Sequence, residues 1–387
     1  MSTPAYINRE IIEWARKRAG LSVGQLANDL NVNATNVEAW EKGLQKPTFT
    51  KAGHIAKRLR IPFGYLFLST PPADEILLPD LRTETGQRPE HPSLDLTDVV
   101  QNTLLKQQWY SDYLRESYDV KLKFIGTARV GGSVTETADA MRKRLGLNQQ
   151  MRDRCNSWEK FKTEFIRNVE EIGILVMRSG VAMSNQRPLS VHEFRGFAVV
   201  DSVAPLVFIN AKDAKSAQTF TLAHELVHIW LGESGVSNPN PQKRSTDELN
   251  IIEKFCNRVA AELLVPSVAV AQMWDKKKNL DQNVRRLVRI YRVSRYVVAR
   301  QAYELDKITE DEYLDYLELY KGLWKPKDRD DDESDGNFYN TFAARNSRTL
   351  ILGVVRALGE HRLSYLDASR LLGIKTATLK KVADRLG

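Results

Sequence analysis

The segment His224-Glu225-Leu226-Val227-His228 limits what this chain can be more than any other part of it. Residues four apart on a helix lie on one face, so His224 and His228 can each offer a ring nitrogen to one metal ion. Glu225 would then be placed to take a proton from a water molecule at that metal. The segment therefore predicts a zinc-binding helix of the kind found in metallopeptidases.

The residues around this segment favour a buried helix. Phe220 to Leu231 is largely apolar, Ser216 or Thr219 is a candidate N-cap, and Gly232 is a candidate terminator. The competing interpretation is a buried helix whose two histidines match the spacing by chance. Because the chain contains only six histidines, such a match is improbable.

A catalytic zinc ion takes three protein ligands, so a third ligand is expected elsewhere. Residues 253–266 read as a second helix that stops at the proline. Glu253 and Asn257 share one face of it, and we predict that Glu253 is the third ligand while Asn257 orients a ligand histidine. Glu262 is the competing ligand candidate. Either carboxylate could instead be a solvated surface charge, which is the usual fate of a glutamate on a helix.

These two segments resemble the ImmA/IrrE family of zinc metallopeptidases. The family pattern is an HExxH helix, here Phe220 to Leu231, followed by a helix of the form E-x-x-x-N, small residues and Leu-Leu-x-Pro, here residues 253–266. The resemblance implies a gluzincin-like endopeptidase in which Glu225 is the general base and acid. It also implies that Zn²⁺ is bound by three residues: His224, His228 and Glu253.

The region before the zinc helix fits the same resemblance. Residues 196–200 and 206–210 read as two strands joined by a short turn. In similar peptidases such a sheet edge holds the substrate backbone as an added strand. Tyr291 and Tyr296, in a basic stretch further on, are both candidates for the hydrogen-bond donor to the transition state, and the sequence does not choose between them.

The N-terminal residues 9–67 resemble an XRE-type helix-turn-helix domain, chiefly through the string Trp40-Glu41-Lys42-Gly43-Leu44-Gln45-Lys46-Pro47. A recognition helix needs polar side chains toward base edges, but Glu38 would repel phosphate. The rival role is a docking module for the similar fold of a substrate repressor or antitoxin. The candidate DNA-binding residues are Asn33, Thr35, Asn36, Lys42 and Lys46.

Composition and charge limit the partners and the cellular compartment that are expected for this chain. The net charge of +8 leaves nucleic acid open as a partner. Only two cysteines occur, Cys155 and Cys256, which favours a reducing cytoplasm. No apolar run approaches 18 residues and the N-terminus lacks a signal-peptide pattern, so no membrane association is expected. Cys256 lies about 100° around its helix from the Glu253 and Asn257 face, so we predict that it belongs to the core.

A chain of 387 residues suggests two to four domains. The predicted fold class is α+β and mainly helical, with an all-α N-terminal domain, a zincin-like (gluzincin-type) metallopeptidase core with a small sheet, and a helical C-terminal region. The predicted organisation is a helix-turn-helix domain (1–70), a linker and helical connector (71–155), the metallopeptidase domain with trailing basic helices (156–305), a helical segment and acidic linker (306–340), and a small helix-turn-helix-like unit (341–387).

The predicted function is that of a zinc-dependent endopeptidase that cleaves a DNA-binding repressor or antitoxin and so regulates transcription. The alternative is a transcriptional regulator or toxin–antitoxin component that uses the metallopeptidase fold as a sensor or binding scaffold. The complete set of histidines and glutamates favours the enzyme, because a scaffold has no need of a general base.

Overall fold

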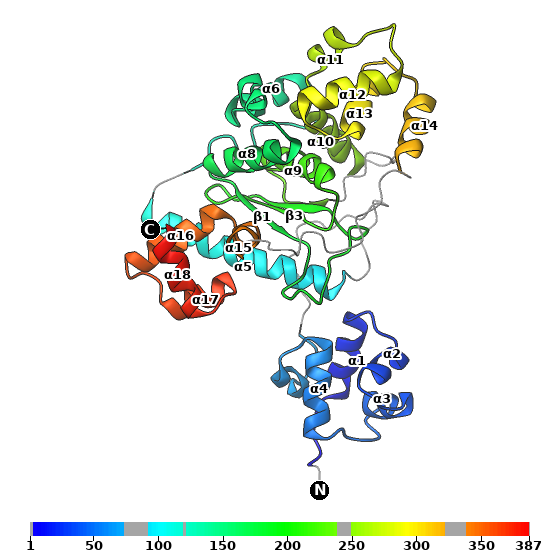
Figure 1. The fold of residues 1–387 in the computed structure, drawn as a ribbon. Coiled ribbons are helices and arrows are strands. Elements are labelled where there is room, and N and C mark those ends of the chain that lie inside the picture. The colour runs from blue at the N-terminus through cyan, green and yellow to red at the C-terminus, as the bar shows by residue number, and fades with distance from the viewer. Residues whose placement is uncertain (1–2, 73–91, 119–120, 238–248, 322–337, 387) are drawn as a thin grey trace. The chain divides into compact units, whose positions relative to one another are not determined.

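The computed structural model describes residues 3–72, 92–118, 121–237, 249–321 and 338–386 (Figure 1). The described chain divides into two compact units, one made of residues 3–72 with 92–99 and the other of the described residues from 100 onward. Residues 73–91, in the predicted linker and connector, and residues 322–337, in the predicted helical segment and acidic linker, lie outside the described residues.

The N-terminal unit is helical, as predicted. Its α2 begins with a capping box, in which the Ser22 hydroxyl accepts from the Gln25 backbone while the Gln25 side chain accepts from the Ser22 backbone. Trp40 is buried, and Glu41 pairs with Arg16 at 2.6 Å. The Trp-Glu string thus joins the third helix to the first. The elements are α1 (Arg9–Arg18), α2 (Val23–Asp29), α3 (Ala34–Glu41), α4 (Phe49–Leu59) and the 3-10 helix η1 (Phe63–Phe67).

The second unit contains one mixed sheet with helices on both faces. Its helices before and within the sheet region are α5, which begins in the first unit (Leu94–Ser117), α6 (Val134–Arg144), α7 (Gln149–Asp153), α8 (Trp158–Glu171), α9 (Lys215–Leu231) and α10 (Leu249–Leu264). Those that follow are α11 (Ser267–Met273), α12 (Leu280–Tyr291), α13 (Arg295–Glu304), α14 (Glu310–Lys321), α15 (Phe338–Asn346), α16 (Arg348–Gly359), α17 (Tyr365–Leu372) and α18 (Thr376–Leu386).

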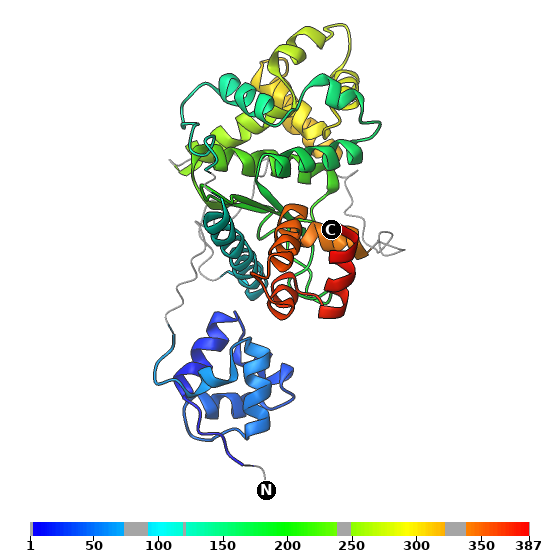
Figure 2. The same cartoon turned by 90° about the vertical axis from the view of Figure 1, so that its left-hand side faces the viewer.

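The described strands run in the order β1-β3-β2-β4. β1 (Leu175–Ser179) pairs in parallel with β3 (Leu206–Asn210), while β2 (Gly196–Val199) is antiparallel to both β3 and β4 (Gly235–Ser237). All of β3 is buried, because α8 and α9 cover one face of the sheet while α5, α15 and α16 lie on the other (Figures 1 and 2). The two strands predicted from sequence are confirmed, and β1 and β4 are additions to them.

The helices that end the chain belong to this second unit. α15 and α16 pack against β1, and α17 and α18 form the bihelical pair predicted from the sequence, joined at Gly373 with a left-handed φ of 68°. The mainly helical α+β fold class is confirmed. Within the described residues, no helix combines the length and the apolar character that crossing a membrane requires.

One lysine of α5 is buried, with a cost to stability. Burial, with a smaller contribution from Arg345, lowers the pKa of Lys106 to about 8. The unfolded chain, with a pKa near 10.4, therefore holds this proton more tightly. The penalty on the folded state is full below pH 8 and vanishes as the pH rises above the unfolded value.

We therefore expect Lys106→Met to raise the free energy of unfolding at pH 7 by as much as about 3 kcal/mol, with no gain near pH 11. Urea unfolding at both pH values measures this effect. Lys143→Met, at an exposed position of α6, is the matched control and should change little. A destabilised Lys106→Met protein at pH 7 would contradict the interpretation.

Candidate metal centre

Helix α9 carries the HExxH segment through the interior of the protein. Its residues from Gln218 to Trp230 are buried, because the helix packs against β2 and β3 on one side and α10 on another. It ends at Gly232, which has a left-handed φ of 79°, as predicted. The predicted N-caps were wrong: the helix begins at Lys215 after Ala214, with no side-chain cap, so Ser216 and Thr219 lie inside it.

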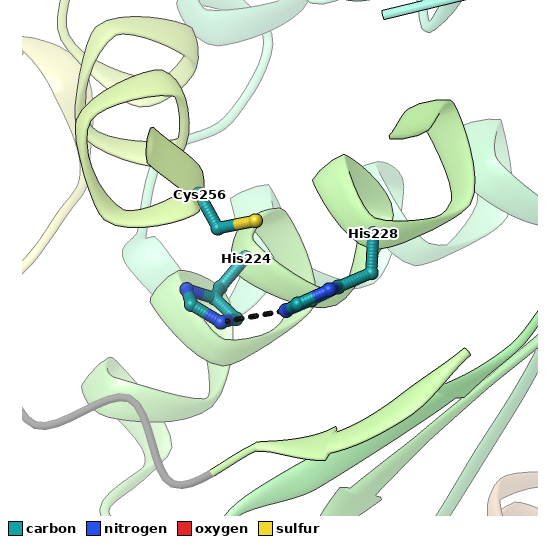
Figure 3. Close-up of side chains that lie close together, drawn as sticks. All are labelled: His224, His228 and Cys256. Atoms are coloured by element: carbon teal, nitrogen blue, oxygen red, sulfur yellow. Dashed lines mark hydrogen bonds between the residues drawn. The ribbon is translucent and has the colours of Figure 1, made fainter. Parts of the chain in front are cut away.

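The two histidines of α9 face each other across one helical turn. Their Nε2 atoms are 3.2 Å apart and both side chains are buried (Figure 3). Helix α10 lies against α9 and brings Glu253 to the same point, with 3.2 Å from its Oε2 to His224 Nε2 and 3.4 Å from its Oε1 to His228 Nε2. Three metal-ligating groups therefore converge from two helices.

The spacing of these atoms fits a zinc ion. Bonds of about 2.0–2.2 Å from zinc to nitrogen and oxygen place the ligand atoms of a tetrahedral site about 3.3 Å apart. The two ring nitrogens, 3.2 Å apart, lie close to this value, and Glu253 approaches them through two different oxygens, Oε2 at 3.2 Å from His224 Nε2 and Oε1 at 3.4 Å from His228 Nε2. The residues present therefore suit the metal in donor type and in spacing.

A further residue of α10 orients the first histidine. Asn257 Oδ1 lies 3.2 Å from His224 Nδ1, so the ring can donate from Nδ1 and keep Nε2 for a metal. Glu262, the competing ligand candidate, lies elsewhere. Its carboxylate accepts from the backbone and hydroxyl of Ser267 at the start of α11 and from Gln301 Nε2. Glu262 therefore joins three helices and takes no part in the cluster.

Burial and close neighbours set the charges in this cluster. Burial lowers the pKa of His224; at His228 burial acts the same way, but Cys256 and Glu253 outweigh it and raise the pKa well above the ordinary value. Burial also opposes ionisation of Glu253, yet the two imidazoles hold its pKa well below the ordinary value. The cluster therefore favours a negatively charged Glu253 beside the two rings, which suits the binding of a cation.

Cys256 also belongs to this cluster, although the sequence analysis assigned it to the core and not to the ligands. It is buried, as predicted for a core residue, but its sulfur and a ring nitrogen of each histidine all lie within 4.8 Å of one another (Figure 3). Cys256 follows Glu253 by three residues, which on a helix places it only about 60° from Glu253 itself.

Glu225 follows His224 on α9, about 100° around the helix from it, and approaches the sheet. It is buried, and its Oε1 would be 3.1 Å from a Cβ atom built on Gly196 of β2. The sequence predicted that the strands now seen as β2 and β3 form a sheet edge open to a substrate backbone. This prediction needs correction, because β3 lies between β1 and β2, and β2 is paired with β4 over Gly196–Ala198.

The comparison with known families agrees with this geometry. Residues 169–303 match the IrrE N-terminal-like domain of the Peptidase M78 family, and residues 12–66 match a helix-turn-helix family. The chain thus contains an ImmA/IrrE-type metallopeptidase domain and, on its N-terminal side, an XRE-type helix-turn-helix domain. The search of curated proteins found no match to the chain.

The two candidate tyrosines, Tyr291 and Tyr296, lie in α12 and α13, the helices that follow α11. Tyr291 lies against Arg152, which donates to the carbonyl oxygens of Tyr291 and Leu264. Leu264 ends α10, about 16 Å along the helix axis from Glu253. Tyr296 is half-buried at the start of α13 and packs against the same core. A role for either tyrosine in the reaction stays a prediction.

The candidate DNA-binding residues of the helix-turn-helix domain are gathered on and after α3. Asn33 is the N-cap of α3 and is exposed, as are Thr35, Lys42 and Lys46, while Asn36 is half-buried. Lys42 lies 3.6 Å from Glu38, and the Lys46 ammonium lies 3.6 Å from the ring centre of Tyr6. The acidic side chain beside Lys42 weakens the attraction of this face for phosphate.

Gly196 is a further position that the metallopeptidase site requires. A Cβ atom there would come within 2.7 Å of Thr221 Cγ2 and 2.9 Å of Phe208 O, in addition to its approach to Glu225. We expect Gly196→Ala to lower the free energy of unfolding by about 1–3 kcal/mol and to reduce peptidase activity, because α9 must move away from β2. Urea unfolding and a cleavage assay measure both effects. Gly359→Ala, where a Cβ atom would meet nothing within 4 Å, is the control; equal behaviour of the two variants would contradict the close packing.

Proposed function

We propose that this protein is a zinc-dependent endopeptidase that cleaves a DNA-binding repressor or antitoxin and so regulates transcription. The observation that carries the proposal is the convergence of two imidazoles and one carboxylate, with nitrogen–nitrogen and nitrogen–oxygen distances of 3.2 to 3.4 Å, beside Glu225, a buried glutamate on the helix of the two histidines. His224, His228 and Glu253 would hold the ion. Zinc, when bound there, would acidify a water molecule and polarise the scissile carbonyl.

The remaining chemistry belongs to residues of the chain. Glu225 takes the proton from the attacking water and returns it to the leaving amine, which is the work of a general base and then a general acid. Its burial between α9 and β2 keeps the carboxylate in one position and strengthens its electrostatic effect on the reacting atoms. Asn257 holds the His224 ring in the orientation that ligation requires.

The helix-turn-helix domain points to the class of substrate. A domain of this kind, fused to a peptidase, brings the enzyme either to DNA that carries a repressor or to the repressor itself. The exposed residues on and just after α3 include both an acid, Glu38, and a lysine, Lys42. This mixture suits contact with a protein as well as with phosphate. We therefore assign this domain to substrate or operator binding.

The experiment uses the full-length, zinc-loaded protein with the helix-turn-helix repressor encoded nearest to its gene. Mass spectrometry of the reaction should show two fragments from a single cut, formed only while the metal is present. A chelator should stop the reaction, and added Zn²⁺ should restore it. An intact repressor, together with unchanged regulation in a Glu225→Gln strain, would contradict the enzyme and favour a regulator built on a metallopeptidase fold.

A further inference from the structure

Cys256 plays no part in the function proposed above, although it lies in the metal cluster. Its side chain is fully buried, and its sulfur lies within 4.8 Å of ring nitrogens of both His224 and His228 (Figure 3). It belongs to the same turn of α10 as Glu253 and Asn257, which contact those same rings. This helical turn therefore presents a carboxylate, a thiol and an amide to two histidines of α9.

The position of the sulfur suits coordination of the same ion. With a zinc–sulfur bond of about 2.3 Å, a sulfur and a nitrogen on one tetrahedral ion are about 3.6 Å apart. A sulfur within 4.8 Å of the ring nitrogens is therefore at most about 1.2 Å further from each of them than this spacing.

The chemistry of the thiol points the same way. A thiol that coordinates zinc loses its proton and binds as a thiolate. Cys155 offers a contrast within the same chain. Its sulfur donates to the Met151 carbonyl oxygen at 3.2 Å and packs in the hydrophobic core. The two buried cysteines therefore differ in their neighbours: a carbonyl oxygen for Cys155 and two metal-binding imidazoles for Cys256.

We propose that Cys256 is a fourth protein ligand of the bound metal ion, which closes the site and holds the peptidase in a latent form. The proposal rests on the proposed function, since it requires a metal ion at His224, His228 and Glu253. Four protein ligands are characteristic of structural zinc sites, whereas catalytic sites keep one position for water. The resting site then resembles a structural one, and hydrolysis begins only when the Cys256 sulfur leaves the ion.

Cobalt substitution tests this directly, because Co²⁺ takes tetrahedral sites and a thiolate ligand adds a sulfur-to-cobalt charge-transfer band in the near ultraviolet. The full-length protein is loaded with Co²⁺ as the wild type, Cys256→Ala, Cys256→Ser and the matched control Cys155→Ala. The wild type and Cys155→Ala should bind one equivalent and show the band. Both Cys256 variants should bind cobalt through the other three ligands and lack the band.

The outcomes distinguish failure of ligation by Cys256 from failure of the proposed zinc peptidase function. A wild type that binds one equivalent of Co²⁺ without the sulfur band would overturn ligation by Cys256 and leave the three-ligand site intact. A wild type that binds neither Co²⁺ nor Zn²⁺ would overturn both. The wild-type spectrum alone decides the question even if a Cys256 variant fails to fold.

Zinc affinity and turnover provide a second readout of the latent form. Loss of the sulfur should weaken zinc binding at least about 10-fold, the lower end of the effect of removing an outer-sphere partner, and should raise the turnover of the zinc-loaded enzyme because water gains the fourth position. Cys155→Ala should change neither quantity. Unchanged zinc affinity in Cys256→Ala would contradict ligation, and unchanged turnover would contradict latency.

Discussion

Glu225→Gln is expected to bind zinc as the wild type does and to cleave its substrate about 10²–10⁴-fold more slowly, the usual contribution of a general acid–base group. The amide fills the same buried space between α9 and β2 but takes no proton from water. The metal remains because Glu225 is not among the three groups whose atoms converge on the site. Metal analysis and single-turnover cleavage on one preparation measure both quantities.

Glu233→Gln is the matched control for this prediction, since it makes the same change at an exposed position just after the end of α9. It should leave zinc content and cleavage unchanged. A Glu225→Gln protein that cleaves at the wild-type rate would require another general base. One that loses its zinc would show that Glu225 supports the metal site.

His228→Ala is expected to lose zinc binding by more than about 100-fold, which is the upper limit seen for outer-sphere partners alone. The variant removes one corner of the tetrahedron and leaves Glu253 with a single imidazole. In the wild type, zinc at about 1,000 times its dissociation constant should stabilise the fold by about 4 kcal/mol, and this increment should be absent from the variant. Calorimetric titration and thermal unfolding with and without zinc measure these effects.

His54→Ala, at an exposed position of α4 in the helix-turn-helix domain, is the control and should keep the wild-type response to zinc. Asn257→Ala should fall between the two, with zinc affinity reduced about 10–100-fold. A His228→Ala protein that is still stabilised by zinc as strongly as the wild type would place the metal at another site.

Much of the candidate site could be predicted because its geometry is local. Two histidines four apart share a helix face wherever that helix lies, and the same holds for Glu253 and Asn257. The contact between these two faces depends on tertiary packing. The small residues Ala260 and Ala261 on α10 allow a close approach to another helix, but they do not determine which helix that is. The position of Glu262 depended wholly on tertiary structure, since its partners lie on α11 and α13.

The features that the sequence did not reveal depend on how separate elements approach one another. Cys256 meets the histidines only through the packing of α10 on α9, and Gly196 is needed only because β2 passes close to Thr221 and Glu225. Strand β1 pairs in parallel with β3, a pairing between distant segments that local patterns do not encode. The true start of α9 at Lys215 has no capping side chain, so no residue type could announce it.

The most direct test of the account is an anomalous difference map, measured at the zinc absorption edge, from crystals of the protein grown with Zn²⁺. We predict one strong peak bonded to His224 Nε2, His228 Nε2 and the Glu253 carboxylate at about 2.0–2.2 Å. A crystal with bound zinc at other residues, or with these three side chains in place and no peak between them, would contradict the assignment of this chain as a zinc peptidase.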